Sequence, residues 1–494
     1  MIETKKTDHV NTDAPVEVKV NAVPEKQEPK VKPLGMVMVD PMIAPYEGEL
    51  RARIARYEDT KQRLTQGKSL KEFANGHMFY GFHKTETGWV YREWAPAARS
   101  MHLYGDFNNW NPASHPMKSL GDGSWEIEIE GTDTLKHLSG IKVLVTGPTG
   151  NIQTRIPLYA TYVVQNTEDT MFTSRIWDPE DPFVWTDEAF SPQSNWPPLI
   201  YEAHVGMATE EKRIGTYLEF RDHMLPRIKD AGYNTIQLMA IMEHPYYGSF
   251  GYQVSNFFAA SSKFGTPDDL KSLVNTAHEM GISVLLDIVH SHAVGNYNEG
   301  INCFDGTEYQ FFHAGGKGNH PSWGTKCFDY GRTGVIHYLL SNVKFWMDEY
   351  HFDGFRFDGV TSMLYHDHAM GTAFTGYEQY FSMNTDVDAV TYLMLAGELV
   401  HENKKGSICI AEDMSGMPGM CAKIENGGIG FDFRLSMGIP DYFVKSAKER
   451  SLGNWNMGQM CYEMTSHRPN EGRVAYVESH DQALVGDKTL IFRL

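Results

Sequence analysis

The chain has 494 residues, a length that accommodates about three domains of ordinary size. Hydrophobic residues make up 41% and charged residues 22%, so most of the chain can bury a core. Lys and Arg number 44 against 63 Asp and Glu, and the net charge of −19 disfavours the phosphates of nucleic acid and the anionic headgroups of membranes. We therefore expect a neutral or cationic partner.

The aromatic and cysteine contents narrow the class further. With 10 Trp and 25 Tyr, the chain has enough rings to line a site for sugars, although core packing explains any single ring better. The 5 cysteines are an odd number without a C-x-x-C pair, which disfavours disulfides and a zinc ribbon and favours a reducing compartment. Because the sequence has neither a secretory h-region nor a long apolar run, we expect a cytoplasmic protein.

The first half of the chain divides into three segments. Residues 1–35 are rich in Lys, Glu, Val and Pro without periodicity, and we expect a disordered arm. Residues 36–75 form a helical segment, in which the charged stretch 47–66 predicts one amphipathic helix. Short alternating segments such as SWEIEIE, separated by Gly and Asn turns, predict an antiparallel β-sandwich over 76–190.

Three residues of the predicted sandwich are candidate sugar contacts. Trp94 lies in REWAP and Trp110 in DFNNWNP, and the two rings could form a stacking surface. A packed tryptophan core explains them equally well. Lys142 is a further candidate for binding substrate.

Residues 191–494 alternate between apolar strands and helical stretches. Seven such units in succession imply a parallel sheet covered by helices, and a (β/α)8-type barrel is more economical than a doubly wound sheet. The chain ends at LIFRL shortly after the seventh strand, so we expect a barrel that lacks its last βα unit. The strands are expected in LIYEAHVGMA, NTIQLMAI, ISVLLDIVH, GFRFDGV, SICIAED, IGFDFRL and RVAYVESHD.

Charged and polar residues interrupt four of these strands near their C-terminal ends. They lie at 287–292, 355–359, 411–413 and 478–482. In a parallel barrel these ends meet at the rim where catalytic residues lie. A structural ion pair or a solvated strand end explains any single case better, because an unpaired charge is costly in a barrel interior. Four cases in chain order favour a catalytic site.

Three acids, one Arg and two His in this pattern suit chemistry at the acetal carbon of a glycoside. One carboxylate must stay ionised to attack the anomeric carbon, and another must be protonated, with a raised pKa, to donate to the departing oxygen. Arg356 precedes Asp358 by two residues, so both face the same side of one strand, and the guanidinium would hold Asp358 deprotonated. His292 and His480 suit sugar hydroxyls, with ordinary buried histidines as the alternative.

The motifs DIVHSH, GFRFDGVT, AEDMSGMPG and ESHDQALVGDKT resemble the four signature regions of the α-amylase superfamily. Together with MEHPYYGSFGYQVSNFFAASSKFGTPDDL and DGVTSMLYHDH, they more closely resemble the eukaryotic-type 1,4-α-glucan branching enzymes. The resemblance runs from about Pro45 to the last residue, and the N-terminal β-domain is similar to a glycogen-binding carbohydrate module.

The resemblance implies roles for the polar residues. Asp358 would be the nucleophile of a covalent glucosyl-enzyme, Glu412 the general acid/base and Asp481 the stabiliser of the transition state. Since the family retains configuration, we expect the carboxyls of Asp358 and Glu412 to lie about 5 Å apart. Five further residues would surround the sugar at the cleavage subsite: Tyr252 beneath the ring, Arg356, His292 and His480 around it, and Asp287 on a hydroxyl or on Arg356.

No cofactor or metal is expected. Related amylases usually have an Asn just before the His of the first signature region, where it helps to bind calcium. Ser291 stands at that position here, and we predict no calcium.

The implied reaction is a transglycosylation: cleavage of an α-1,4 bond in a glycogen- or starch-type glucan, then transfer of the segment to a 6-hydroxyl to form an α-1,6 branch. The oligomeric state is left open, with a monomer as the expectation. Two alternatives remain. One is an amylase or debranching hydrolase of the same superfamily, and the other is a glucan-binding protein without turnover.

Overall fold

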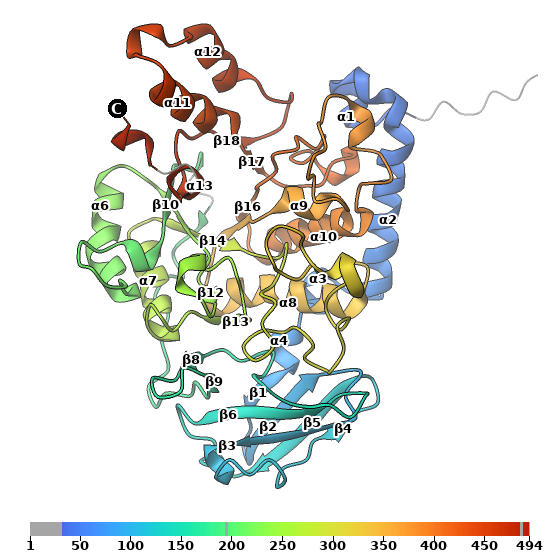
Figure 1. Cartoon of the computed structure of the whole chain (residues 1–494), viewed down its shortest axis with the longest axis vertical. Coiled ribbons are helices and arrows are strands. Elements are labelled where there is room, and N and C mark those ends of the chain that lie inside the picture. The colour runs from blue at the N-terminus through green and yellow to red at the C-terminus, as the bar shows by residue number, and fades with distance from the viewer. Residues whose placement is uncertain (1–31, 193–195, 485–487, 494) are drawn as a thin grey trace, which may run out of the picture. The chain divides into compact units, whose positions relative to one another are not determined.

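A computed structural model describes residues 32–192, 196–484 and 488–493. The chain divides into two units, Met1–Pro33 and Leu34–Leu494, of which the second is compact. The disordered arm expected over 1–35 lies almost wholly outside the described residues. The described helices and strands all belong to the second unit (Figure 1).

The segment before the β-domain is helical, and α2 (Glu47–Thr65) is its longest element. It is the single helix that the charged stretch predicts. Leu50, Tyr57 and Leu64 are buried and lie seven residues apart. One face of the helix therefore packs against the rest of the unit. The shorter helices here are α1 (Gly35–Val39), η1 (Pro41–Tyr46), α3 (Leu70–Phe73) and α4 (Gly76–Phe79).

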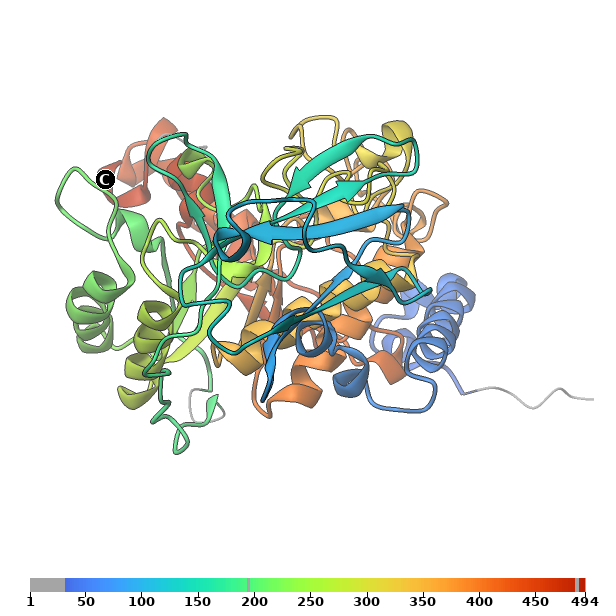
Figure 2. The ribbon, with the colours of Figure 1, turned by 90° about the horizontal axis from the view of Figure 1, so that it is seen from below.

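The β-domain that follows is built from two antiparallel sheets (Figures 1 and 2). One has the strand order β1-β2-β5-β4, and the other has the order β3-β6-β9-β8 with β7 beside β6. Tyr91 and Trp125 of the first sheet share a core with Leu103 and Val143 of the second, as in a sandwich. The strands are β1 (Gly81–Lys84), β2 (Gly88–Trp94), β3 (Ser100–Gly105), β4 (Lys118–Ser119), β5 (Ser124–Glu130), β6 (Gly140–Thr146), β7 (Ile152–Arg155), β8 (Val163–Gln165) and β9 (Phe172–Arg175), with η2 (Asp106–Asn108) after β3.

The second half of the chain contains a curled parallel sheet of seven strands in the order β10-β11-β14-β15-β16-β17-β18. The seven strands lie in the seven apolar segments of the sequence, which confirms the predicted α/β class and the barrel-type sheet. Within the described residues, β10 and β18 are the two edges. The strands are β10 (Ile200–Ala203), β11 (Thr235–Leu238), β14 (Ser283–Ile288), β15 (Gly354–Phe357), β16 (Ile408–Ala411), β17 (Phe433–Leu435) and β18 (Arg473–Val474), with a hairpin of β12 (Met242–Glu243) and β13 (Asn256–Ala260).

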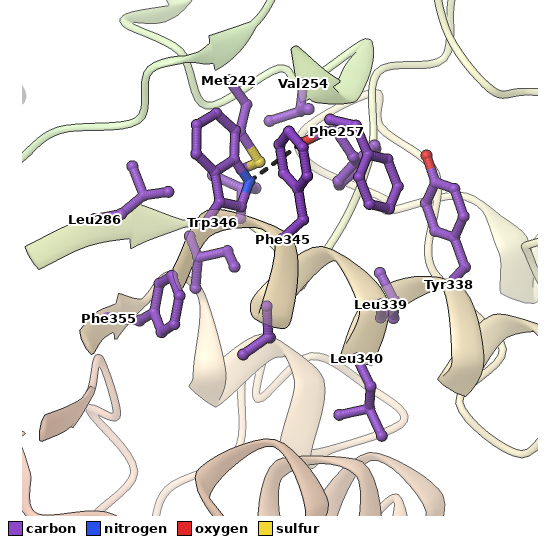
Figure 3. Close-up of a cluster of buried hydrophobic side chains, with 14 of the residues drawn as sticks. Met242, Val254, Phe257, Leu286, Tyr338, Leu339, Leu340, Phe345, Trp346 and Phe355 are labelled. Carbon is purple, nitrogen blue, oxygen red and sulfur yellow. Dashed lines mark hydrogen bonds between the residues drawn. The ribbon is translucent and has the colours of Figure 1, made fainter. Parts of the chain in front are cut away.

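The longest helices of this half, α8 (Thr333–Glu349) and α10 (Val387–Asn403), are buried along most of their length. Figure 3 shows Trp346 of α8 among apolar side chains of the sheet and the hairpin, and its indole N–H donates a 3.2 Å hydrogen bond to the carbonyl of Phe257. This core fixes the strands beneath the site. The other helices are η4 (Val205–Met207), α5 (Tyr217–Glu219), η5 (Phe220–Met224), α6 (Leu225–Asp230), η6 (Tyr247–Ser249), α7 (Pro267–Glu279), η7 (Gly315–Gly318), α9 (Val360–Leu364), η8 (Tyr377–Gln379), η9 (Ile424–Asn426), α11 (Gly438–Glu449), η10 (Leu452–Asn454), α12 (Met457–Thr465), α13 (His480–Leu484) and η11 (Leu490–Phe492).

The sandwich is tied to the long segment that joins β14 to α8. Arg155 at the end of β7 is 1% exposed, and it donates hydrogen bonds to the carbonyls of Gly300 (2.6 Å) and Asn302 (2.8 Å). In the other direction, the Gln310 amide donates to the carbonyl of Trp94 at 2.7 Å. The β-domain therefore supports a segment that also forms part of the candidate site.

None of the helices in the described part of the chain combines the length and the apolar character needed to cross a membrane.

Candidate active site

The acids predicted from the sequence meet at one rim of the parallel sheet. Asp358 directly follows β15, Glu412 directly follows β16, and Asp481 lies in α13 after β18. All three line one cavity of about 710 Å³. They converge because the C-terminal ends of parallel strands share an edge of the sheet. Other residues on the wall are Tyr252, His292, Trp323, Thr325, His480 and Met414.

Arg356 of β15 lies at the centre of the site and is 1% exposed. Its Nη1 donates to Asp287 at 2.8 Å and to Asp358 at 2.6 Å, and its Nη2 lies 3.2 Å from a carboxylate oxygen of Glu412. Arg356 and Asp358 thus share a side of the strand, as their spacing predicts. Of the two contacts expected for Asp287, the structure shows the one with Arg356. A single buried cation holds three carboxyl groups in place.

The pKa of Glu412 is raised to about 8. Burial is the largest cause, and the negative charges of Asp358 and Asp481 add to it, while Arg356 acts in the opposite direction. The Gly359 amide donates to Glu412 at 2.6 Å and fixes its orientation. A carboxyl group protonated at neutral pH beside the Arg-paired Asp358 is what a general acid and a nucleophile require.

Tyr252 and His480 line the same part of the cavity. The Tyr252 hydroxyl donates to Asp287 at 2.7 Å, and its ring stacks on that of His480 with a centroid distance of 5.1 Å. Burial disfavours the charged form of His480, but Glu202 outweighs it through a hydrogen bond and its charge and raises the His480 pKa to about 9. His480 is therefore a cation at neutral pH.

His292 also lies where the sequence predicts, on the cavity wall. Its Nε2 donates to the Tyr252 carbonyl at 2.7 Å, and its Nδ1 lies 2.9 Å from the Ser291 hydroxyl. That hydroxyl donates to Asp358 at 3.4 Å. Burial lowers the pKa of His292, so the ring is neutral at physiological pH. The absence of calcium, which Ser291 led us to expect, stays a prediction.

Two family descriptions match parts of the chain. Carbohydrate-binding module 48 (Isoamylase N-terminal domain) matches residues 79–160, and the alpha amylase catalytic domain matches residues 208–331. Two solved structures share the fold. A putative alpha amylase from Salmonella typhimurium has a TM-score of 0.60 at 18% identity, covering 82% of this chain and 66% of that one. A pullulanase from Bacillus acidopullulyticus has a TM-score of 0.62 at 20% identity, covering 84% and 54%.

Curated relatives are far more similar in sequence. The 1,4-alpha-glucan-branching enzyme of Felis catus is 47% identical over 466 residues, which cover 93% of this chain and 66% of that enzyme. The enzyme of the same name from Rhizophagus irregularis is 46% identical over 467 residues, covering 93% and 68%. The chain belongs to the 1,4-α-glucan branching enzyme family. It spans about two thirds of the length of these relatives, 66% and 68%. The resemblance seen in the four signature motifs is thereby confirmed.

In this member of the branching-enzyme family, the three candidate sugar contacts of the β-domain lie in two different places. Trp94 packs edge-on against Phe311 at 5.3 Å, and a side chain added at Gly334 would meet its ring at 2.3 Å. The structure thus gives Trp94 a packing role between the β-domain and the start of α8. It does not lie in the catalytic cavity.

Trp110 and Lys142 lie together on another part of the β-domain. Trp110 is 39% exposed, and its ring is edge-on to Tyr104 at 5.7 Å. Tyr104 pairs with Lys142 across β3 and β6, so Tyr104 borders both Trp110 and Lys142. Burial lowers the pKa of Lys142 from its ordinary value. The two residues therefore stay candidates for a glucan surface outside the cavity.

Sequence reasoning missed Glu202, which accepts hydrogen bonds from the His480 amide and from its ring, each at 2.8 Å. A signal for it existed, because LIYEAHVGMA carries one acid inside an otherwise apolar strand. Reasoning also missed Trp323 and Thr325, which line the cavity from the segment between β14 and α8. That segment has neither helical nor strand periodicity to mark an inward side.

Proposed function

We propose that the protein is a transglycosidase that cleaves an α-1,4 bond in a glucan and re-attaches the released segment through an α-1,6 bond. The observation that carries the proposal is the Arg356 centre, which contacts Asp358 and Glu412 at 2.6 and 3.2 Å while the Glu412 pKa is raised to about 8. Family membership supports the choice of branching over simple hydrolysis.

In the first step, an Asp358 oxygen attacks the anomeric carbon and forms an ester bond as the bond to the leaving oxygen breaks. Glu412 gives its proton to that oxygen, so the departing chain leaves as a neutral alcohol. Arg356 donates a hydrogen bond to Asp358 and holds its carboxyl group toward the carbon. Asp481, which lines the same cavity, stabilises the positive charge that develops on the sugar.

In the second step, the 6-hydroxyl of an acceptor chain attacks the same carbon and the ester to Asp358 breaks. Glu412, now a carboxylate, takes the proton of that hydroxyl. Two inversions give net retention. Tyr252 beneath the ring and His292 and His480 at its rim would fix the sugar during both steps, since the three residues line the cavity.

An iodine assay with amylose tests the proposal. A branching enzyme shifts the absorption maximum of the amylose–iodine complex with little new reducing sugar. An amylase or debranching hydrolase instead releases reducing ends in proportion to the colour change. A glucan-binding protein without turnover changes neither signal while still binding glycogen. Release of reducing ends, or no change at all, would contradict the proposal.

We further propose that the Trp110–Lys142 surface holds glucan chains outside the cavity. The exposed indole next to Tyr104 and Lys142 suits a sugar face and its hydroxyls. The cytoplasm is the proposed compartment. Its support is that the five cysteines are free thiols, three of them buried.

A further inference from the structure

Trp323 lies in the wall of the cavity, where its ring is held by stacking on His320. Its ring lies parallel to His320, with 3.8 Å between centroids and 6° between planes. The Nδ1 of His320 accepts the amides of Ser322 and Trp323, and its Nε2 lies 3.2 Å from the Ser362 hydroxyl. Burial lowers the pKa of His320 to about 4, so this ring is uncharged. His320 covers one face of the indole, the ring of His292 lies tilted to it with 5.0 Å between centroids, and 43% of Trp323 stays exposed.

Thr325, two residues further on, lines the same cavity with a buried polar group. The residue is 2% exposed, and its hydroxyl finds no hydrogen-bond partner within the described residues. A buried hydroxyl without a partner costs free energy. An apolar residue of the same shape would avoid that cost, so the hydroxyl is best explained by a ligand group that completes its hydrogen bond.

The indole borders the reaction centre near both carboxyl groups, because Gly359 follows Asp358 in the chain and contacts Glu412. A side chain built at Gly359 would come within 3.6 Å of the Cη2 atom of Trp323. The same glycine donates its amide to Glu412 at 2.6 Å. Trp323 is thus one residue away from the group that protonates the leaving oxygen and later deprotonates the acceptor hydroxyl. The cleavage subsite is assigned to other residues, among them Tyr252 and Asp287. The Tyr252 hydroxyl donates a 2.7 Å hydrogen bond to Asp287.

We infer that Trp323 and Thr325 form the subsite for the glucose unit of the acceptor chain, with the indole as the stacking platform and the Thr325 hydroxyl as its hydrogen-bond partner. This inference rests on the proposed transglycosidase function and adds to it a reason why a glucan, and not water, receives the covalently held segment. A bound sugar ring over the indole excludes water from the ester of Asp358 and presents a hydroxyl to Glu412.

The test separates the two steps with α-maltosyl fluoride as donor and maltoheptaose as acceptor. Fluoride leaves without occupying the acceptor subsite. In Trp323→Ala we expect the fluoride release of the first turnover, without acceptor, to stay within about twofold of the parent chain, whereas the maltoheptaose concentration for half-maximal transfer rises about tenfold. Equal losses in both measurements, or an unchanged acceptor requirement, would overturn the inference.

Thr325→Val separates a ligand role from a structural one. Because the variant removes an unpartnered hydroxyl, we expect its melting temperature to equal or exceed that of the parent chain, while the acceptor requirement rises about tenfold. A lower melting temperature with an unchanged acceptor requirement would contradict the proposal. The matched control is Tyr309→Ala, which removes another aromatic ring of the same segment, 51% exposed and outside the cavity lining, and should change neither quantity.

Binding gives a readout that needs no turnover. In an Asp358→Asn background, Trp323→Ala and Thr325→Val should each weaken the binding of maltoheptaose in calorimetry, and unchanged binding in both would overturn the inference. Failure of the proposed function looks different. The parent chain would then release only free maltose from the fluoride and form no transfer product at any maltoheptaose concentration.

Discussion

Glu202 and His480 are joined by two hydrogen bonds of 2.8 Å, one from the backbone amide and one from the imidazole ring. Glu202 belongs to β10 and His480 begins α13, which follows β18. Since β10 and β18 are the edges of the sheet in the described residues, this pair bridges the open side of the curled sheet. It also fixes the His480 ring against Tyr252 in the cavity.

The Glu202→Gln variant should lose stability in a pH-dependent way. Since Glu202 raises the His480 pKa from 6.5 to about 9, the stabilisation is fully present below pH 6.5 and is lost as the pH rises through about 9. On the acid side, the Glu202 pKa is lowered from 4.5, so the stabilisation is lost as the pH falls below that value. We expect the melting temperatures of the parent and variant chains to differ at about pH 6 and to converge by about pH 10. A gap that stays constant between these pH values would contradict the pairing.

The raised pKa of Glu412 predicts the alkaline limit of activity. The group must be protonated to act as an acid, so kcat/KM should fall about tenfold per pH unit above its pKa of about 8. The check is the pH–rate profile for branching of amylose at substrate concentrations well below KM. Fluoride release from α-maltosyl fluoride in the first turnover needs no proton donor and should keep its rate there. If the activity already fell near pH 4.5, the ordinary pKa of a carboxyl group, burial would not raise the pKa of Glu412.

Asp358→Asn should lower turnover by about a thousandfold or more, because it removes the nucleophile. Glu412→Gln should slow the amylose reaction by a similar factor but spare first-turnover fluoride release, which needs no acid. Iodine absorption and fluoride release measure the two effects. Thermal melts serve as the control, since a variant that simply unfolds would lose both activities together. If Asp358→Asn kept full activity, the assignment of Asp358 as the nucleophile would be wrong.

The two tryptophans of the β-domain should respond differently to truncation. Trp94→Ala removes packing against Phe311 and the start of α8 and should lower the free energy of unfolding by about 3 kcal/mol. Trp110→Ala should cost less than about 1 kcal/mol and weaken glycogen binding about tenfold. Urea unfolding and affinity electrophoresis in glycogen measure these quantities. If Trp94→Ala weakened glycogen binding and Trp110→Ala lowered stability, Trp110 would be the packing residue and Trp94 the glucan contact.

Much of the fold was predictable because each strand of the sheet is an apolar segment bounded by helix-forming residues. The acids were predictable for a related reason. Asp358 and Glu412 interrupt such segments at their C-terminal ends, where an unpaired charge would be costly unless it had a role. The Arg356–Asp358 contact followed from the two-residue repeat of a strand.

The sequence marks Glu202 only as a lone acid in an apolar strand, and the rest of the site depends on tertiary contacts that local pattern does not record. Glu202 lies within an apolar strand, and its partner His480 is 278 residues away. Trp323 and Thr325 belong to a segment with irregular backbone, where side-chain direction depends on tertiary contacts with the β-domain and with α9. The separation of Trp94 from Trp110 likewise depends on which surface of the β-domain faces α8.

The guanidinium of Arg155 has a consequence for anyone dividing this protein into parts. It is buried and donates hydrogen bonds from the end of the sandwich to the carbonyls of Gly300 and Asn302. Excising the sandwich would remove the donors of those two carbonyls and expose them to solvent. The segment between β14 and α8, which bears Trp323, would lose this support. The two halves should therefore be expressed and engineered as one piece, because the β-domain doubles as scaffolding for the wall of the cavity.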